Sequence, residues 1–486
     1  MTRPGCDCNE ANSWGAEVLT LLRVLLVCWT TLGFCTVGQA EILSAGFDLN
    51  QVSNDEVLNG VLKLTSKDGE TSPELKLAIE HFRAGKIDAA FAAFGQARSS
   101  LPHLPPPEVM ISRLLIASQK FEPVNGLLER AILDTPQSPV VALAFGEFAL
   151  ATGRNADAQL HFERVLDLYE IEESSDLSAN NKAPAKILAA VYSGLAVIAE
   201  RRLRWDQAQA LLQKSQELAP KDTRLVLRKA HALFQQEQYQ QATEELQRAV
   251  EIDANLPPAE LTVGTWYVAA KKFDSATESF ETALQQSPED FRVISTATTY
   301  FLERGAFTRA EEVLNSSPSE EHSTRRFQML RGNVARGAGD LNTAESCFEN
   351  LLAEAPADIE AANQLAAVLA EQDEQSKRQR ALQLAEVNFR QLPRSAELRA
   401  TLGWALFQLE RLDLAEQVFQ PLNSGSTISP DAAYYYGRFL EARQQTEQAG
   451  RLYATAMQAQ GVFIHRADCE QRVKSLLGER NASSKE

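Results

Sequence analysis

A small residue recurs at a fixed interval through most of this chain of 486 residues. The interval is 34 residues over the middle of the chain, with one longer step of 50 before it and one of 37 after it. The eleven positions in this series, ten of them alanine, are Ala90, Val124, Ala158, Ala208, Ala242, Ala276, Ala310, Ala344, Ala381, Ala415 and Ala449. Such a period indicates one supersecondary unit that is repeated, and it leaves few other folds open to the chain.

Residues 261–288 show what one unit contains. Apolar and small residues at helical spacing, including Gly264 and Tyr267, predict a first helix; a second carries Phe273, Ala276 and Phe280 and ends before Pro288. Glycine and alanine let the two helices approach closely while the aromatic rings fill the space around them. Neither helix can bury its apolar face alone, so each unit requires a neighbour.

This order of small, aromatic and proline positions resembles the tetratricopeptide repeat. The resemblance covers residues 71–463 as about eleven repeats and is weaker in the second, seventh, ninth and eleventh. It implies an all-α fold: a right-handed superhelical solenoid of helix-turn-helix repeats, closed by a C-terminal capping helix. Because each repeat adds to one core, we expect a single continuous domain.

The residues outside the array suggest export. Arg23 precedes an uncharged apolar run, residues 24–39, that ends in small residues before Glu41. Residues 1–40 therefore resemble a secretory signal, and a run shorter than the ~20 residues of a membrane span favours cleavage. Residues 1–22 are acidic, however, which leaves open an uncleaved N-terminal anchor or a true start downstream of Met1. We expect a protein of the periplasm or cell envelope, membrane-anchored if the signal is retained.

Several shorter segments interrupt or flank the repeats. Residues 41–70 form a polar lead-in, and a polar insertion near 171–188 is expected to be an exposed loop. Three additional residues within 371–380 predict a lengthened turn in the ninth repeat. Residues 464–480 carry Cys469, Val473 and Leu476 at helical spacing, which predicts the capping helix. The polar tail, 481–486, is expected to be disordered.

The composition argues against several classes of function. A net charge of −17 disfavours nucleic acid as a partner, because a phosphate backbone requires a basic surface. The six histidines are scattered without metal-ligand spacing, and the motifs of nucleotide-binding folds and hydrolases are missing. Cys347 precedes the packing residue Phe348 and is interpreted as a small core residue, with no disulfide to Cys469 expected. We therefore expect no enzyme activity, no metal and no cofactor.

The family resemblance implies that the first helix of each repeat lines a concave groove. The residues at these groove positions that we single out as candidates for ligand binding are Arg224, Arg228, His231, Leu261, Thr265, Arg326, Asn333, Tyr434 and Arg438. One interpretation is an extended partner segment whose acidic group is held by Arg224 and Arg228. The other is structural: the arginines belong to a solvated face, or acidic residues of the adjoining repeat neutralise them.

Some family members grip a C-terminal carboxylate through lysine and asparagine side chains over three repeats. Arg224 and Arg228 match the last pair of that scheme, but Glu147 and Gly194 replace its asparagines, which disfavours a full carboxylate clamp. The leading hypothesis is an exported, non-enzymatic scaffold of the bacterial envelope that binds protein or peptide partners. The alternative is a membrane-tethered assembly factor for a secretion or polysaccharide-export machine.

Overall fold

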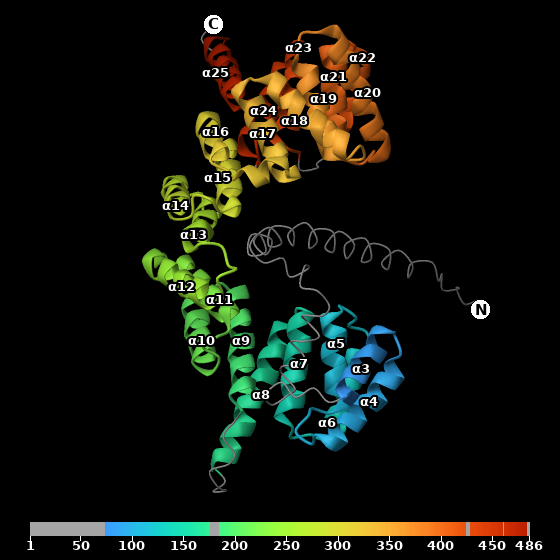
Figure 1. Cartoon of the computed structure of the whole chain (residues 1–486), viewed down its shortest axis with the longest axis vertical. Coiled ribbons are helices and arrows are strands. Elements are labelled where there is room, and N and C mark those ends of the chain that lie inside the picture. Colours follow the sequence, from blue (N-terminus) through green and yellow to red (C-terminus); the bar gives the residue numbers. More distant parts are fainter. Residues whose placement is uncertain (1–72, 175–183, 424–427, 460, 484–486) are drawn as a thin grey trace, which may run out of the picture. The chain divides into compact units, whose positions relative to one another are not determined.

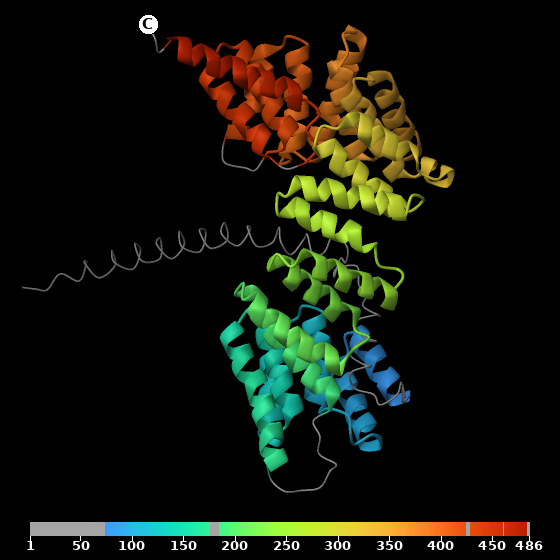
Figure 2. The same ribbon diagram turned by 90° about the vertical axis from the view of Figure 1, so that its left-hand side faces the viewer.

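The computed structural model describes residues 73–174, 184–423, 428–459 and 461–483, and every regular element in these ranges is helical (Figure 1). The two helices of a repeat lie side by side in both views, as α7 (Pro139–Ala151) and α8 (Asn155–Ser174) do (Figure 1, Figure 2). The fold is an all-α helical repeat solenoid, as the sequence predicts. Its contacts divide between Ala276 and Thr277 into two compact units, and we describe each unit by itself.

The first unit contains the helices of repeats one to five and the first helix of repeat six. These are α3 (Pro73–Arg83), α4 (Ile87–Ser100), α5 (Pro107–Ala117), α6 (Val124–Asp134), α7, α8, α9 (Ala185–Arg201), α10 (Trp205–Leu218), α11 (Thr223–Gln235), α12 (Tyr239–Ile252) and α13 (Ala259–Ala269). The boundary between the units lies within α14 (Phe273–Gln286).

The second unit contains repeats seven to eleven and the C-terminal helix. Its elements are α15 (Phe291–Glu303), α16 (Phe307–Asn315), η1 (Ser319–Ser323), α17 (Arg325–Ala338), α18 (Leu341–Glu354), α19 (Ile359–Glu371), α20 (Gln375–Gln391), α21 (Ala396–Gln408), α22 (Leu412–Phe419), η2 (Gln420–Asn423), α23 (Pro430–Ala442), α24 (Thr446–Gln458) and α25 (Arg466–Ser483).

The column of small residues is buried as predicted. All eleven members of the series, from Ala90 to Ala449, have an exposed fraction of 0%. The glycines that accompany it are equally constrained: a Cβ added to either Gly146 or Gly194 would lie 2.5 Å from the ring of Phe162. Phe162 is thus held between α7 and α9 by two residues that have no side chain, which explains why these positions are small.

Most repeats turn between their two helices in one way. A residue one or two positions beyond the first helix has a left-handed backbone, as in Leu203 (φ 57), and the next amide, that of Arg204, donates to the Ala199 carbonyl. This is the Schellman ending of a helix, which satisfies carbonyls that would otherwise lack partners. Glycine fills the left-handed position in some repeats, including Gly85 and Gly339, and other residues fill it elsewhere.

The ninth repeat is the exception, and the predicted lengthened turn is wrong. Helix α20 begins at Gln375, six residues before Ala381, whereas α18 begins at Leu341, three residues before Ala344. The three additional residues are therefore helical. Residues 375–380 contain only glutamine, serine, lysine and arginine, which tolerate or favour a helix, and neither glycine nor proline breaks it.

The segments that interrupt and close the array are partly described. The ends of the predicted insertion are helical, since α8 extends to Ser174 and α9 begins at Ala185, while residues 175–183 lie outside the described ranges. Helix α25 provides the expected capping helix: it packs against α24 with Cys469 fully buried. The predicted leader 1–40 and lead-in 41–70 lie outside the described ranges, as do residues 484–486 of the predicted disordered tail. Residues 481–483 of that tail are helical, because α25 extends to Ser483. Among the helices that are described, none is both apolar and long enough to cross a bilayer.

Candidate functional site

The nine candidate residues fall in both units. Five lie in the first unit, on α11 and α13: Arg224, Arg228, His231, Leu261 and Thr265. Four lie in the second, on α17 and α23: Arg326, Asn333, Tyr434 and Arg438. We refer to the side of the first helices that carries these positions as the groove face of each unit.

Arg224 has a largely exposed side chain, with 77% of its surface accessible, and it forms an ion pair. Its guanidinium Nη2 lies 3.0 Å from Oδ2 of Asp222, the residue that caps the N-terminus of α11. The hydrogen bond to Asp222 raises the pKa of Arg224. Because this partner belongs to the same helix end, the pair does not tie one repeat to another, and the guanidinium can also face a ligand.

Arg228 has a structural role. Its Nε and Nη2 atoms each lie 3.1 Å from an oxygen of Glu200 on α9, and Nη1 donates to the Ser193 hydroxyl at 2.7 Å. Burial raises the pKa of Glu200, and the charge and hydrogen bonds of Arg228 act in the opposite direction. An acidic residue of the adjoining repeat therefore neutralises Arg228, as the structural interpretation of the sequence proposed.

His231 lies between two tryptophans. Its ring centroid is 5.5 Å from that of Trp205 and 5.2 Å from that of Trp266, both in edge-on geometry. Burial lowers the pKa of His231 to about 4, so the imidazole is neutral at physiological pH. This side chain offers aromatic surface and a hydrogen bond to a partner, but no positive charge.

The α13 candidates are less available. Leu261 is only 5% exposed and belongs to the interior. Thr265 is half-buried, and its hydroxyl donates to the Thr262 carbonyl at 2.7 Å.

The structure also bears on the carboxylate clamp. Gly194, at one of the clamp positions, cannot carry an asparagine side chain because Phe162 fills that space. The geometry therefore agrees with the sequence in disfavouring a carboxylate clamp.

Two α17 candidates differ from the arginines of the first unit. Arg326 is exposed and Asn333 is half-buried, and neither makes a hydrogen bond or ion pair with any described residue.

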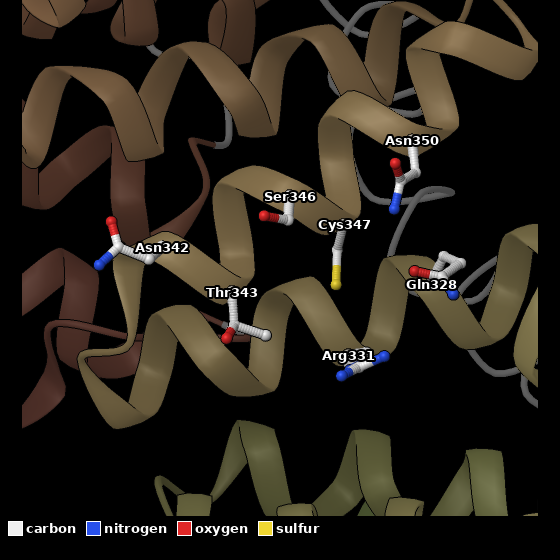
Figure 3. Close-up of a pocket in the computed structure, with 7 residues that line it drawn as sticks. All are labelled: Gln328, Arg331, Asn342, Thr343, Ser346, Cys347 and Asn350. Carbon is white, nitrogen blue, oxygen red and sulfur yellow. The ribbon is translucent and has the colours of Figure 1, made fainter.

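A hollow of about 340 Å³ lies between α17 and α18 and is shown in Figure 3. Its lining residues are mainly polar: Gln328, Arg331, Asn342, Thr343, Ser346, Cys347 and Asn350. This hollow was not predicted from the sequence, although Gln328 and Arg331 lie about one helical turn apart on α17.

Cys347 contributes little surface to the lining of that hollow. The side chain is 3% exposed, and burial raises the pKa of its thiol. This confirms its interpretation as a small core residue. Both it and Cys469 are free thiols. In the described residues no cluster of His, Cys, Asp and Glu side chains is suited to a metal ion.

A network of buried polar groups on the groove face of the second unit was not predicted from the sequence. The Arg336 side chain is 1% exposed, and its Nε lies 3.1 Å from Oε2 of Glu371. Its Nη1 lies 3.4 Å from Oδ2 of Asp431, and Nη2 donates to the hydroxyl of Tyr435. His465 Nε2, from the segment before α25, lies 3.1 Å from Oε1 of the same Glu371. The network thus joins α17, α19 and α23 to the C-terminal segment.

Tyr434 is covered by that segment, and Arg438 is partly covered by it, with 30% of its side chain accessible. Tyr434 is 2% exposed and its ring stacks on His465, with centroids 4.4 Å apart. Its hydroxyl donates to Oδ2 of Asp468 at 2.5 Å and accepts from Nη1 of Arg438 at 2.8 Å. In this structure the chain itself therefore occupies the surface that these two residues were expected to offer a partner.

Comparison with known proteins supports the repeat assignment. The model of the tetratricopeptide repeat family matches residues 203–260 and 267–334. With the register and the helices described above, this match shows that the chain contains tetratricopeptide repeats, and the tetratricopeptide repeat fold is that of a protein-interaction scaffold. A search of curated proteins gave no match.

Solved structures of tetratricopeptide repeat proteins match this chain at low identity and low TM-score. A tetratricopeptide repeat protein from Parabacteroides merdae is 12% identical, with 60% of this chain and 99% of that chain covered and a TM-score of 0.35. Yeast Tom70 is 13% identical, with coverage of 87% and 96% and a TM-score of 0.35. YrrB, described as having an unusual peptide-binding site, is 16% identical, with coverage of 41% and 95% and a TM-score of 0.30. We draw no functional argument from likenesses this distant.

Proposed function

We propose that this protein is an exported, non-enzymatic scaffold of the bacterial cell envelope that binds an extended partner segment along the groove face of its first unit. The observation that carries the proposal is a series of apolar groove positions in repeats three to six that are only half-buried. They are Val140, Leu150, Val197, Leu227 and Val268. Half-exposed apolar side chains spaced along successive helices suit the side chains of an extended peptide.

The charges on this face define the polarity of the partner. Arg224 extends into solvent beside Leu227, while Arg228 is already neutralised by Glu200. The partner's acidic group therefore binds Arg224, with Arg228 fixing the adjoining helices and His231 contributing neutral aromatic surface. The apolar run 24–39 supports export, and retention of that run as an anchor would instead give a membrane-tethered assembly factor.

Affinity capture with the full chain tests the proposal. Wild type, Arg224→Gln and Arg451→Gln are used as bait on soluble and membrane fractions, and partners are identified by mass spectrometry. Arg451 is the matched control, because its side chain is 78% exposed and lies on α24, a second helix of its repeat. We expect Arg224→Gln to melt like wild type and to lose envelope partners, with the loss shrinking as salt rises. Equal capture by all three baits would contradict the proposal.

A further inference from the structure

The segment that joins α24 to α25 lies on the groove face of the second unit. We call residues 461–465 the linker. Phe463 is fully buried, with its ring centroid 6.0 Å from that of Tyr434, and the His465 ring stacks on the same tyrosine, as described above. Two side chains of the linker therefore contact residues that the repeat register places in the groove.

The linker backbone makes no hydrogen bond to the repeats among the described residues: the carbonyls of Phe463 and His465 accept only from the amides of Arg466 and Cys469 in α25. The amides of residues 461–465 donate no hydrogen bond to any described residue. Gly461 has a φ of +110, which turns the chain as it leaves α24. Side-chain contacts such as those of Phe463 and His465, without a backbone hydrogen bond to the repeats, resemble the docking of a peptide more than the packing of a further helix.

The surface beneath the linker carries an excess of negative charge. Three carboxylates, Glu371, Glu397 and Asp431, lie on it, and the guanidinium of Arg336 faces two of them. Glu397 and Asp431 occupy the same position in consecutive repeats, and burial raises the pKa of both. A positively charged residue brought to this surface would be favoured electrostatically.

The same surface has hydrogen-bonding capacity that the linker does not use. Three buried atoms lack a hydrogen-bond partner among the described residues: Oδ1 of Asn363, Nε1 of Trp404 and Oδ1 of Asp431. Asn363 and Trp404 are at least nine-tenths buried and lie at groove positions of α19 and α21. Buried polar atoms without partners are costly, so a ligand that supplied partners would gain affinity.

We propose that the groove face of repeats eight to eleven is a second binding site, for an extended segment with an aromatic residue followed two or three positions later by a basic residue. Residues 463–466, Phe-Ile-His-Arg, are the chain's own copy of that segment and occupy the site in the absence of a partner. The proposal concerns the second unit only and does not depend on the first-unit site proposed above.

Tethering explains why such a site would be closed at rest. A short linker holds its segment at an effective concentration of the order of millimolar, so a free segment of equal intrinsic affinity competes poorly. Weakening the chain's own copy should open the site to a segment supplied in trans. The double variant Phe463→Ser/His465→Ala does this while leaving the carboxylates and Trp404 in place.

The test uses a fluorescent synthetic peptide with the sequence of residues 459–468, AQGVFIHRAD, titrated into the full chain and followed by anisotropy. We expect the double variant to bind it at least tenfold more tightly than wild type, and to lose that binding when the peptide's histidine is alanine. His322→Ala is the matched control, since His322 also stacks on an aromatic ring, that of Phe327, but lies in η1. A double variant that melts cooperatively and binds no peptide overturns the proposal.

Hydrogen exchange on the wild type provides a second readout if the double variant does not fold. A docked linker opens without unfolding of the unit, so the amides of Arg466 and Cys469, which donate to the Phe463 and His465 carbonyls, should exchange at least 100-fold faster than those in the middle of α23 and α24. Exchange of these amides only at the rate of global unfolding would show that the linker is an integral part of the core, and would overturn the proposal.

Discussion

Arg336 and Glu371 are 35 residues apart and form a buried ion pair between the first helices of consecutive repeats. The arginine side chain is 1% exposed and the glutamate side chain 12%. Arg336 occupies a groove position of the repeat register, and its guanidinium is paired with other residues of the same chain. The relationship shows that a charged residue at a groove position can be part of the structure and not of a ligand site.

Replacing Arg336 with glutamine should strongly destabilise the protein. The change leaves Glu371 and Asp431 buried without the cation that neutralises them, and breaking a buried pair from one side costs about 3–5 kcal/mol. Arg390→Gln is the control, because the Arg390 pair with Glu386 is exposed and should contribute no more than about 1 kcal/mol. Urea denaturation of the full chain measures both, and equal losses would contradict the assignment.

Stability should fall in acid through Glu371. Burial would raise the pKa of this carboxyl, but the charges and hydrogen bonds of Arg336 and His465 outweigh burial and lower the pKa from 4.5 to about 2. A lowered pKa contributes stability above pH 4.5 that is lost as the pH falls toward 2, and here it corresponds to ~3 kcal/mol.

The comparison with Glu371→Gln isolates this effect. Wild type should be the more stable at pH 6, and its advantage should shrink steadily below pH 4.5. Asp431 has a pKa raised by burial and so has the opposite pH dependence, but it is present in both proteins. A difference between wild type and variant that does not vary between pH 6 and pH 3 would exclude Glu371 as the source.

The glycines that contact Phe162 should not tolerate a methyl group. In Gly146→Ala the new Cβ would lie 2.5 Å from the ring, so α7 or Phe162 must shift, at a cost of about 1–3 kcal/mol. Gly126→Ala in α6 is the matched control: nothing lies within 4 Å, and alanine should stabilise that helix by about 0.5–1 kcal/mol. Thermal melts that move in the same direction for both variants would mean the packing is not as described.

Features set by close packing within the repeat were predictable from the sequence. The buried column from Ala90 to Ala449 follows from the period alone, because a larger side chain at each crossing would separate the helices. The helical character of residues 375–380 was missed because inserted residues can lengthen either a turn or a helix without changing the register that follows.

Features that depend on contacts across several repeats were not predictable. Tyr435 is 99 residues from Arg336, and His465 is 94 residues from Glu371. The repeat register assigns Tyr434 to the groove but gives no information about what covers it. In the first unit the sequence left both roles of Arg224 and Arg228 open, and only the position of Glu200 and the exposure of Arg224 separate the two residues.

Export makes a prediction about the N-terminus of the cellular protein. Cleavage after Ala40 would give a mature chain that begins at Glu41, as the apolar run and its small residues indicate. Intact-mass analysis of protein recovered from separated cell fractions checks this. Full-length chain in the membrane fraction would support the anchored alternative, and full-length chain in the soluble cytoplasm would exclude export.

Photo-crosslinking in cells tests the central claim, that the groove face of the first unit binds a partner. A benzoylphenylalanine residue is placed at position 224 in one strain and at position 451 in another, two sites with side chains 77% and 78% exposed in the structure. We expect discrete crosslinks to envelope proteins from position 224 and none of these from position 451. Identical crosslinking from both positions, or no crosslinks from position 224 in a correctly folded protein, would contradict it.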